Sequence, residues 1–143
     1  MRAKTHSTEA TFAVFQSSRD TIDARTVTKT MDCLPNGVWH YWFSDADVQQ
    51  FMQAMPSRFH TLFHALKHWP HKSDLWRSLL LYLHGGVYLD AESTLLAPLH
   101  DLLQRFGSLF VYDTLHRNVY NGFFFSRPRN PALLAVANRQ PFE

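Results

Sequence analysis

The chain has 143 residues, which suits one domain large enough to bury a hydrophobic core. Hydrophobic residues make up 45% of the composition and aromatic residues 15%, which argues against disorder. The net charge is +2 with histidine neutral, and the basic residues are scattered, so no nucleic-acid-binding function is expected. No apolar run approaches the ~20 residues needed to span a bilayer, and the single cysteine excludes an internal disulfide.

The N-terminus lacks the apolar core of a signal peptide. We therefore expect a cytoplasmic location if the chain is complete, and a Golgi or other secretory membrane if an anchor is missing from it. Residues 1–10 are polar and are expected to be a loose segment, followed by a single domain over residues 11–143.

The first elements alternate between strand and helix patterns. Residues 11–15 are rich in β-forming side chains and predict a strand, and residues 21–31 predict a helix. Pro-Asn-Gly at 35–37 predicts a turn, and the aromatic run VWHYWF at 38–43 predicts a second strand.

Two helices are predicted next. Ser44 with Asp47 three residues later is a weak variant of the capping box. The helix that it opens would point Val48, Phe51 and Met52 inward. Residues 57–69 predict another helix, which Pro70 is expected to end. The apolar side of that helix consists of Phe59, Leu62, Phe63 and Leu66.

A third helix is predicted over residues 74–84, with Ser73 as its cap and Gly85 as a left-handed stop. It is apolar nearly all round, which is typical of a helix buried between layers. Asp74 would lie in its first turn, where the helix dipole favours a carboxylate. Arg77 is the only charge among seven large apolar residues and needs a partner, which Asp74 can supply.

The remaining pattern completes an α/β domain. Residues 87–90 predict a short strand, and residues 98–106 a short helix. Residues 108–112 and 119–125 predict two more strands, and Asn130-Pro131 opens a last helix. Strands that alternate with helices predict a mostly parallel sheet flanked by helices.

Two carboxylates, Asp90 and Glu92, come at the end of the predicted strand at 87–90. Ligands of open α/β sheets bind beyond the carboxyl ends of the strands. Mg²⁺ or Mn²⁺ would relieve the repulsion between two acids there and would bring substrate phosphate oxygens with it. The two acids alone favour a simpler interpretation, a solvated loop start, because short motifs have many false matches.

The surroundings of the pair resemble a known family. HKSDLWRSLLLYLHGGVYLDAESTLLAPL, residues 71–99, resembles the signature of glycosyltransferases with a DXD sugar-binding region, most closely family 32, which includes fungal α-mannosyltransferases. The shared pattern is Ser-Asp-x-x-Arg on a buried helix, then Gly-Gly-x-Tyr-x-Asp-x-Asp. Weaker likenesses at AVFQSS, WHYWFSDADVQQFM and VYNGFFFSRPRNPAL extend the resemblance over most of residues 11–139.

The resemblance implies a GT-A-like nucleotide-sugar-binding fold and the metal-dependent, retaining transfer of a hexose from a nucleotide-diphosphate sugar to a glycan or lipid acceptor. It implies Mn²⁺ or Mg²⁺ as cofactor, held by Asp90 and Glu92, which would also be the catalytic residues. It implies that the donor-binding residues are Asp74, Arg77, Gly86, Tyr88 and Asp90. Tyr120 and Asn121 would lie on the acceptor side.

Three features depart from the family pattern. The second acid is Glu92 instead of Asp, and Phe15 stands before Gln16 where the family has His. Family domains also continue with a His-containing segment that has no counterpart here, so the domain is expected to be incomplete at its C-terminus. A catalytically inactive module that binds a nucleotide sugar or glycan therefore remains an alternative.

Other interpretations of the candidate residues are structural. Asp74 and Arg77 also fit a purely structural ion pair, and Tyr120 and Asn121 fit ordinary strand packing. His60 and His64 could share a helical face and bind zinc, but a half-solvated face is favoured because no HExxH pattern or nearby Cys supports a site. The aromatic residues at 39–43 could stack on a sugar or a base, but strand packing is favoured.

Overall fold

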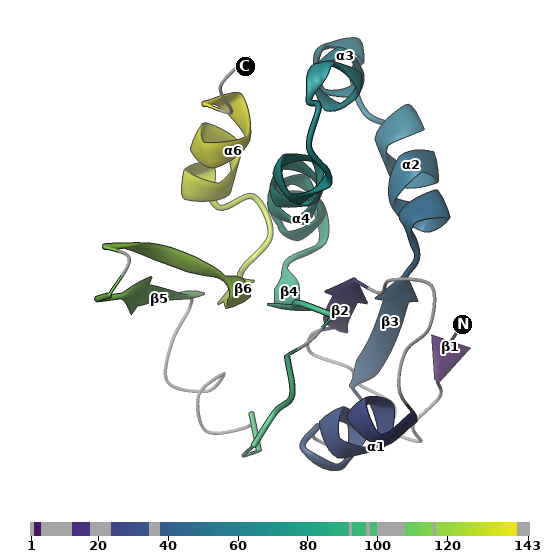
Figure 1. The fold of residues 1–143 in the computed structure, drawn as a ribbon, viewed down its shortest axis with the longest axis vertical. Coiled ribbons are helices and arrows are strands. Elements are labelled where there is room, and N and C mark those ends of the chain that lie inside the picture. Colours follow the sequence, from purple (N-terminus) through teal and green to yellow (C-terminus); the bar gives the residue numbers. More distant parts are fainter. Residues whose placement is uncertain are drawn as a thin grey trace.

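The computed structural model describes residues 2–3, 13–17, 24–34, 38–91, 93–96, 98–99, 108–115 and 117–139. Within these ranges the chain forms a six-stranded sheet in the order β1-β3-β2-β4-β6-β5 (Figure 1). The strands are β1 (Arg2–Ala3), β2 (Ala13–Ser17), β3 (Trp39–Phe43), β4 (Gly86–Leu89), β5 (Ser108–Asp113) and β6 (Asn118–Ser126).

The centre of the sheet is parallel and its margins are antiparallel. Val14 of β2 lies opposite His40 of β3 on one side and Val87 of β4 on the other, and both pairings are parallel. β1 pairs antiparallel with β3, β6 with β4, and β5 with β6 as a hairpin. This mixed sheet with flanking helices confirms the expected α/β, GT-A-like fold.

Helices cover both faces of the sheet. Figure 1 shows α2, α3, α4 and α6 on one side and α1 on the other. Among the described residues, none of these helices has the length and apolar character needed to cross a bilayer. The helices are α1 (Ala24–Asp32), α2 (Asp45–Gln53), α3 (Ser57–Ala65), α4 (Trp69–His84) and α6 (Pro131–Asn138).

The period of two in the strands divides the core between the faces. Phe15, Tyr88 and Phe124 belong to the larger cluster, which packs under α2, α3, α4 and α6. Their neighbours Val14 and Val87 belong to a smaller cluster on the opposite face. β4, the middle strand, is therefore buried on both sides, so the residue at its carboxyl end starts from a fixed position.

Pro70 begins a helix and does not end one, which corrects the prediction for this region. α3 ends at Ala65, and α4 starts at Trp69 with Pro70 in its first turn. A proline there is tolerated because the first backbone N–H groups of a helix have no partner inside it. Ser73 is therefore not the cap, and Asp74 lies in the second turn, so the dipole argument for its carboxylate is wrong.

Gly85 and Gly86 connect α4 directly to β4. Gly85 has the expected positive φ of 63°, but its ψ of −167° is extended, so it is not the left-handed cap predicted. A Cβ on Gly85 would lie 2.6 Å from Pro128 Cδ, and one on Gly86 would lie 2.4 Å from the Ala13 carbonyl oxygen. Both glycines are needed for backbone conformation and close packing.

Two other predictions meet different outcomes. The capping box at the start of α2 is confirmed, because Asp47 N–H donates to Ser44 Oγ and Ser44 N–H donates to Asp47 Oδ2. The helix predicted at 98–106 lies mostly outside the described residues, as do residues 4–12 of the N-terminal segment, whereas Arg2–Ala3 forms β1.

His40 should make the stability of the fold sensitive to acid. It is fully buried, and burial lowers its pKa from 6.5 to about 4. Below pH 6.5 the unfolded chain takes up a proton that the folded chain refuses, so the free energy of unfolding should fall as the pH drops from about 6.5 to about 4. At about 1.4 kcal/mol per pKa unit, the loss approaches ~3 kcal/mol.

Urea unfolding at a series of pH values measures this loss. His40→Leu should be less stable near pH 7, because the Gln16 side chain loses its partner at a cost of ~1–3 kcal/mol. It should, however, lose less additional stability than the parent between pH 6.5 and 4. Parallel pH profiles for the two proteins would contradict the assignment.

Candidate functional site

Arg77 is the centre of a polar cluster at the carboxyl end of β4. Its side chain projects from the middle of α4 and is only 6% exposed. Nη2 lies 3.2 Å from Asp74 Oδ1, and Nη1 lies 3.1 Å from Asp90 Oδ1. Nη1 also donates to the Asn121 carbonyl oxygen at 2.6 Å, and the Ser73 carbonyl and hydroxyl accept from Nε and Nη2. The buried guanidinium therefore links α4 to the ends of β4 and to β6.

Asp90 is held by backbone and side-chain contacts together. It comes directly after β4, and its N–H donates to the Gly122 carbonyl at 2.8 Å. The Tyr88 hydroxyl donates to Asp90 Oδ1 at 2.7 Å, and the Arg77 guanidinium lies 4.5 Å from the centre of the Tyr88 ring. Within the described part of the chain, these polar contacts of the carboxylate all go to Oδ1. Oδ2 is therefore the oxygen that Asp90, 39% exposed, offers to a ligand.

β6 contributes Asn121 from the opposite side of the cluster. The Asn121 amide donates to Asp74 Oδ1 at 2.7 Å. A Cβ at Gly122 would lie 2.4 Å from the Tyr120 hydroxyl and 3.1 Å from Asp90 Oδ2. The absence of a side chain at Gly122 thus lets Tyr120 fold over the strand beside Asp90. Both predicted acceptor-side residues, Tyr120 and Asn121, come to the cluster.

A buried glutamine holds the carboxylate segment from behind. Gln16 ends β2 on the α1 face of the sheet, and its amide donates to the carbonyls of Asp90 at 2.9 Å and Ser93 at 3.1 Å. His40 Nε2 lies 3.2 Å from Gln16 Oε1, which fixes the orientation of that amide. The turn after β4 is closed by the Ser93 N–H, which donates to the Asp90 carbonyl.

Sequence reasoning missed this role of Gln16. The residue appeared there only in the segment AVFQSS, as the position after an expected histidine. The available signal was a polar side chain inside an apolar strand, which requires a buried partner.

Two predicted site residues are not brought to the cluster. Gly86 lies at the opposite end of β4 from Asp90, where it packs against the Ala13 carbonyl. Glu92 lies outside the described residues. Within the described ranges, no three His, Cys, Asp or Glu side chains are grouped as a metal would require, so Asp90 is the one carboxylate seen at the predicted metal position.

The alternatives for other residues are also decided by placement. His60 and His64 face each other with 3.1 Å between their Nε2 atoms, but α3 ends at Ala65, so His68 is not on the same helix. Tyr41 stacks on Phe15, and Phe43 contacts Trp76, so these two aromatic side chains of β3 pack against the core.

The charges of the cluster are unbalanced. Two carboxylates, Asp74 and Asp90, face one guanidinium. Burial raises the pKa of Asp74, and the charge of Asp90 raises it further, while Arg77 opposes both effects. Asp74 therefore gains a proton at a higher pH than an ordinary aspartate, and its charged form is costly enough to favour an added hydrogen-bond donor or cation.

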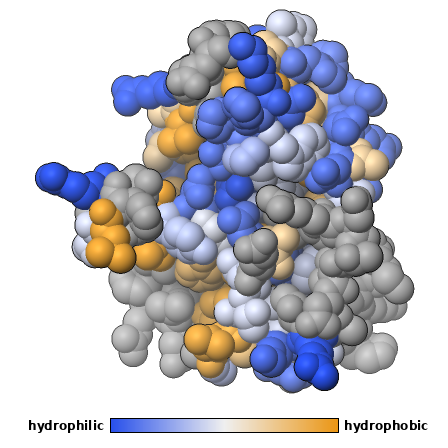
Figure 2. Space-filling view, viewed as in Figure 1, coloured by the Kyte–Doolittle hydropathy of each residue, from blue (hydrophilic) through white to orange (hydrophobic). Residues whose placement is uncertain are grey.

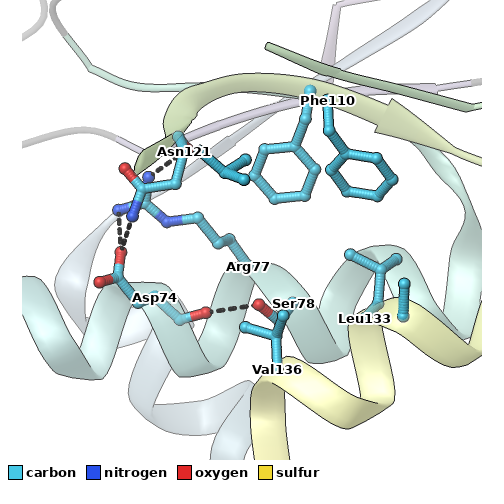
Figure 3. A pocket seen from close by; sticks show the side chains of 10 residues that line it. Asp74, Arg77, Ser78, Phe110, Asn121, Leu133 and Val136 are labelled. Carbon is cyan, nitrogen blue, oxygen red and sulfur yellow. Dashed lines mark hydrogen bonds and ion pairs between the residues drawn. The ribbon is translucent and has the colours of Figure 1, made fainter. Parts of the chain in front are cut away.

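A cavity of about 480 Å³ opens beside the cluster (Figure 3). Asp74, Arg77 and Asn121 gather on one side of it, and Phe110 and Leu133 lie on the other. It is enclosed by α4, the β5–β6 hairpin and α6. The arrangement places hydroxyl-binding side chains, an available carboxylate oxygen and an apolar space next to one another.

Comparisons with known proteins place these residues in context. The chain matches the family described as "Glycosyltransferase sugar-binding region containing DXD motif" over residues 4–108. It is 29% identical over 108 residues to Inositol phosphoceramide mannosyltransferase 1 of Schizosaccharomyces pombe. The match covers 75% of this chain and 34% of the relative, so the chain spans about a third of the relative's length. No solved structure matches significantly.

Arg77 and Asp74 should differ in their contribution to stability. Arg77→Leu leaves two neighbouring carboxylates without their cation and should cost ~3–5 kcal/mol of unfolding free energy. Asp74→Asn should cost less than ~1.5 kcal/mol, because Asp74 is 27% exposed and Arg77 keeps Asp90 and the Asn121 carbonyl. Urea unfolding of both variants measures the difference, and equal losses would contradict a three-residue cluster.

Gln16 should control the order of the segment after β4. Gln16→Leu removes two hydrogen bonds to the carbonyls of Asp90 and Ser93, so the Ser93 amide should exchange its hydrogen roughly tenfold faster. Amide exchange monitored by NMR measures this. Gln49→Leu, on the exposed surface of α2, is the matched control and should leave the exchange unchanged. If both variants exchange alike, Gln16 does not hold this segment.

Proposed function

Because the chain belongs to the family of glycosyltransferase sugar-binding regions with a DXD motif, we propose that it transfers a hexose from a nucleotide-diphosphate sugar. The observation that carries the proposal is the position of Asp90, at the carboxyl end of the central β4 strand and in contact with the buried Arg77. Ligands of open α/β sheets bind at this edge.

Asp74, Arg77 and Tyr88 form the donor side of the proposed site. Asp74 Oδ1 is engaged by Arg77 and Asn121, which leaves Oδ2 to accept a hydrogen bond from a sugar hydroxyl. Tyr88 and Arg77 hold Asp90 at Oδ1, so that its second oxygen keeps one direction without rearrangement. Such preorganisation lowers the cost of binding a charged donor.

The proposed cofactor is Mn²⁺ or Mg²⁺. Asp90 Oδ2 fits the oxygen donor that such a cation prefers, and Glu92 would supply a second carboxylate. The bound metal would stabilise the negative charge that develops on the leaving nucleotide diphosphate. The chain's own contribution is to hold the donor against Asp90 and Asp74 and to keep Arg77 neutralised within the fold.

The acceptor is proposed to be a glycan or a lipid. The name of the fission-yeast relative states that it transfers mannose to inositol phosphoceramide, which makes mannose and a lipid-linked hydroxyl the first pair to test. Tyr120 and Asn121 lie on the β6 side of the cluster, where this acceptor would approach. Retention at the anomeric carbon is part of the proposal.

A second candidate is a module that binds a nucleotide sugar without turnover. It is favoured by the absence, among described residues, of a complete group of metal-binding side chains, and by Glu92 in place of aspartate. The two candidates share donor binding and differ in catalysis. Hydrolysis or transfer measured with a panel of nucleotide sugars separates them.

Metal dependence is the first test of donor binding. Titration calorimetry with UDP and GDP should show binding with Mn²⁺ or Mg²⁺ and little binding in excess chelator. Asp90→Asn removes an anionic ligand at unchanged size and should weaken metal-dependent nucleotide binding at least tenfold. Equal nucleotide affinity with and without metal would reject a metal bridge.

Variants of Glu92 extend the same titration. Glu92→Gln should lower Mn²⁺ affinity markedly, whereas Glu92→Asp, which restores the usual family spacing, should keep or raise it. If Glu92 is only a solvated acid, both changes should alter stability by less than ~0.5 kcal/mol and leave metal binding unchanged.

A further inference from the structure

The cavity beside the cluster has two chemically different ends. Its polar end is formed by Asp74, Arg77 and Asn121. The remaining wall is apolar and is built from three elements, the β5–β6 hairpin, α4 and α6. The side chains that give this wall its character are Phe110, Val119, Phe124, Leu133 and Val136.

The apolar wall continues onto the surface. Phe110, Val119 and Val136 line the cavity and are also exposed, and the neighbouring Val111 and Leu115 are exposed on the same hairpin. Figure 2 shows apolar surface over α6 and over the far end of the hairpin. An exposed apolar patch next to a built site indicates a ligand or partner with apolar surface.

The polar groups of the cavity select the chemistry of the ligand. The apolar wall offers no hydrogen bonds, so a nucleobase there would lose hydrogen bonds to water without replacement. Ser78 Oγ already donates to the Asp74 carbonyl and is used within α4. The two carboxylates facing one guanidinium disfavour an anionic group and favour neutral hydroxyls, which donate to carboxylate oxygens.

We propose that this cavity takes the alkyl chain of an amphiphilic acceptor whose neutral, hydroxylated head group lies against Asp74 and Asn121. The identification of the ligand as an acceptor rests on the proposed function, but the binding itself requires neither donor nor metal. The head group would then lie next to Asp90, where the sugar is transferred, and the chain would lie between the hairpin and α6.

Binding of monomeric alkyl glucosides tests the cavity directly. Hexyl, heptyl and octyl glucosides are titrated below their micellar concentrations, without nucleotide or metal. Affinity should rise about fourfold for each added methylene, which is the transfer free energy of ~0.8 kcal/mol expressed as a ratio. Octyl sulfate, which has the same chain and an anionic head, should bind at least tenfold more weakly than octyl glucoside.

Two substitutions on α6 provide a matched pair. Ala132 lines the cavity, so Ala132→Trp should fill it and lower octyl glucoside affinity at least tenfold. Ala135 is exposed on the same helix and does not line the cavity, so Ala135→Trp should bind like the parent. Thermal unfolding of both variants verifies that they fold.

Several outcomes would overturn the proposal. Affinity that does not depend on chain length, or an Ala132→Trp variant that binds like the parent, would show that the alkyl chain lies elsewhere. Sedimentation that shows a dimer dissociated by Ala132→Trp would assign the face to a second copy of the chain. Metal-dependent nucleotide binding without alkyl glucoside binding would overturn this inference alone and leave the proposed function standing.

Discussion

The buried guanidinium of Arg77 is the constraint on which the rest of the structure depends. A charge that is 6% exposed on an apolar helix requires compensation, and it obtains this from Asp74, Asp90 and the Asn121 carbonyl. These partners belong to α4, the end of β4 and β6. The same contacts that neutralise Arg77 therefore assemble the three segments of the candidate site, so that the fold and the site are stabilised together.

The two faces of the central sheet share the work of positioning Asp90. On the α4 face, Tyr88 and Arg77 hold Oδ1 of its carboxylate. On the α1 face, Gln16 holds its carbonyl, with His40 behind it. Because β4 is buried on both sides, a residue at its carboxyl end can be fixed from both directions. Such a carboxylate needs little reorganisation on binding, which suits charged ligands.

The resemblance of residues 71–99 to a DXD family was sufficient to predict the α/β fold and the candidate residues Asp74, Arg77, Tyr88, Asp90 and Asn121, which the structure brings together. Local reasoning was less reliable for Pro70. Its ring is compatible both with the region after a helix and with the first turn of the next one. Only the packing of the whole α4 helix against the sheet decides between the two.

The sequence by itself determined the family, the order of strands and helices, and the chemical identity of the acids, because motif spacing and hydrophobic periodicity are local properties of the chain. Tertiary structure alone decided that Gln16, 74 residues from Asp90, holds its carbonyl, and that Asn121 meets Asp74 across 47 residues. It also created the cavity, since no single segment encloses it. Contacts between distant segments depend on sheet order and register, and no local pattern in one sequence specifies those.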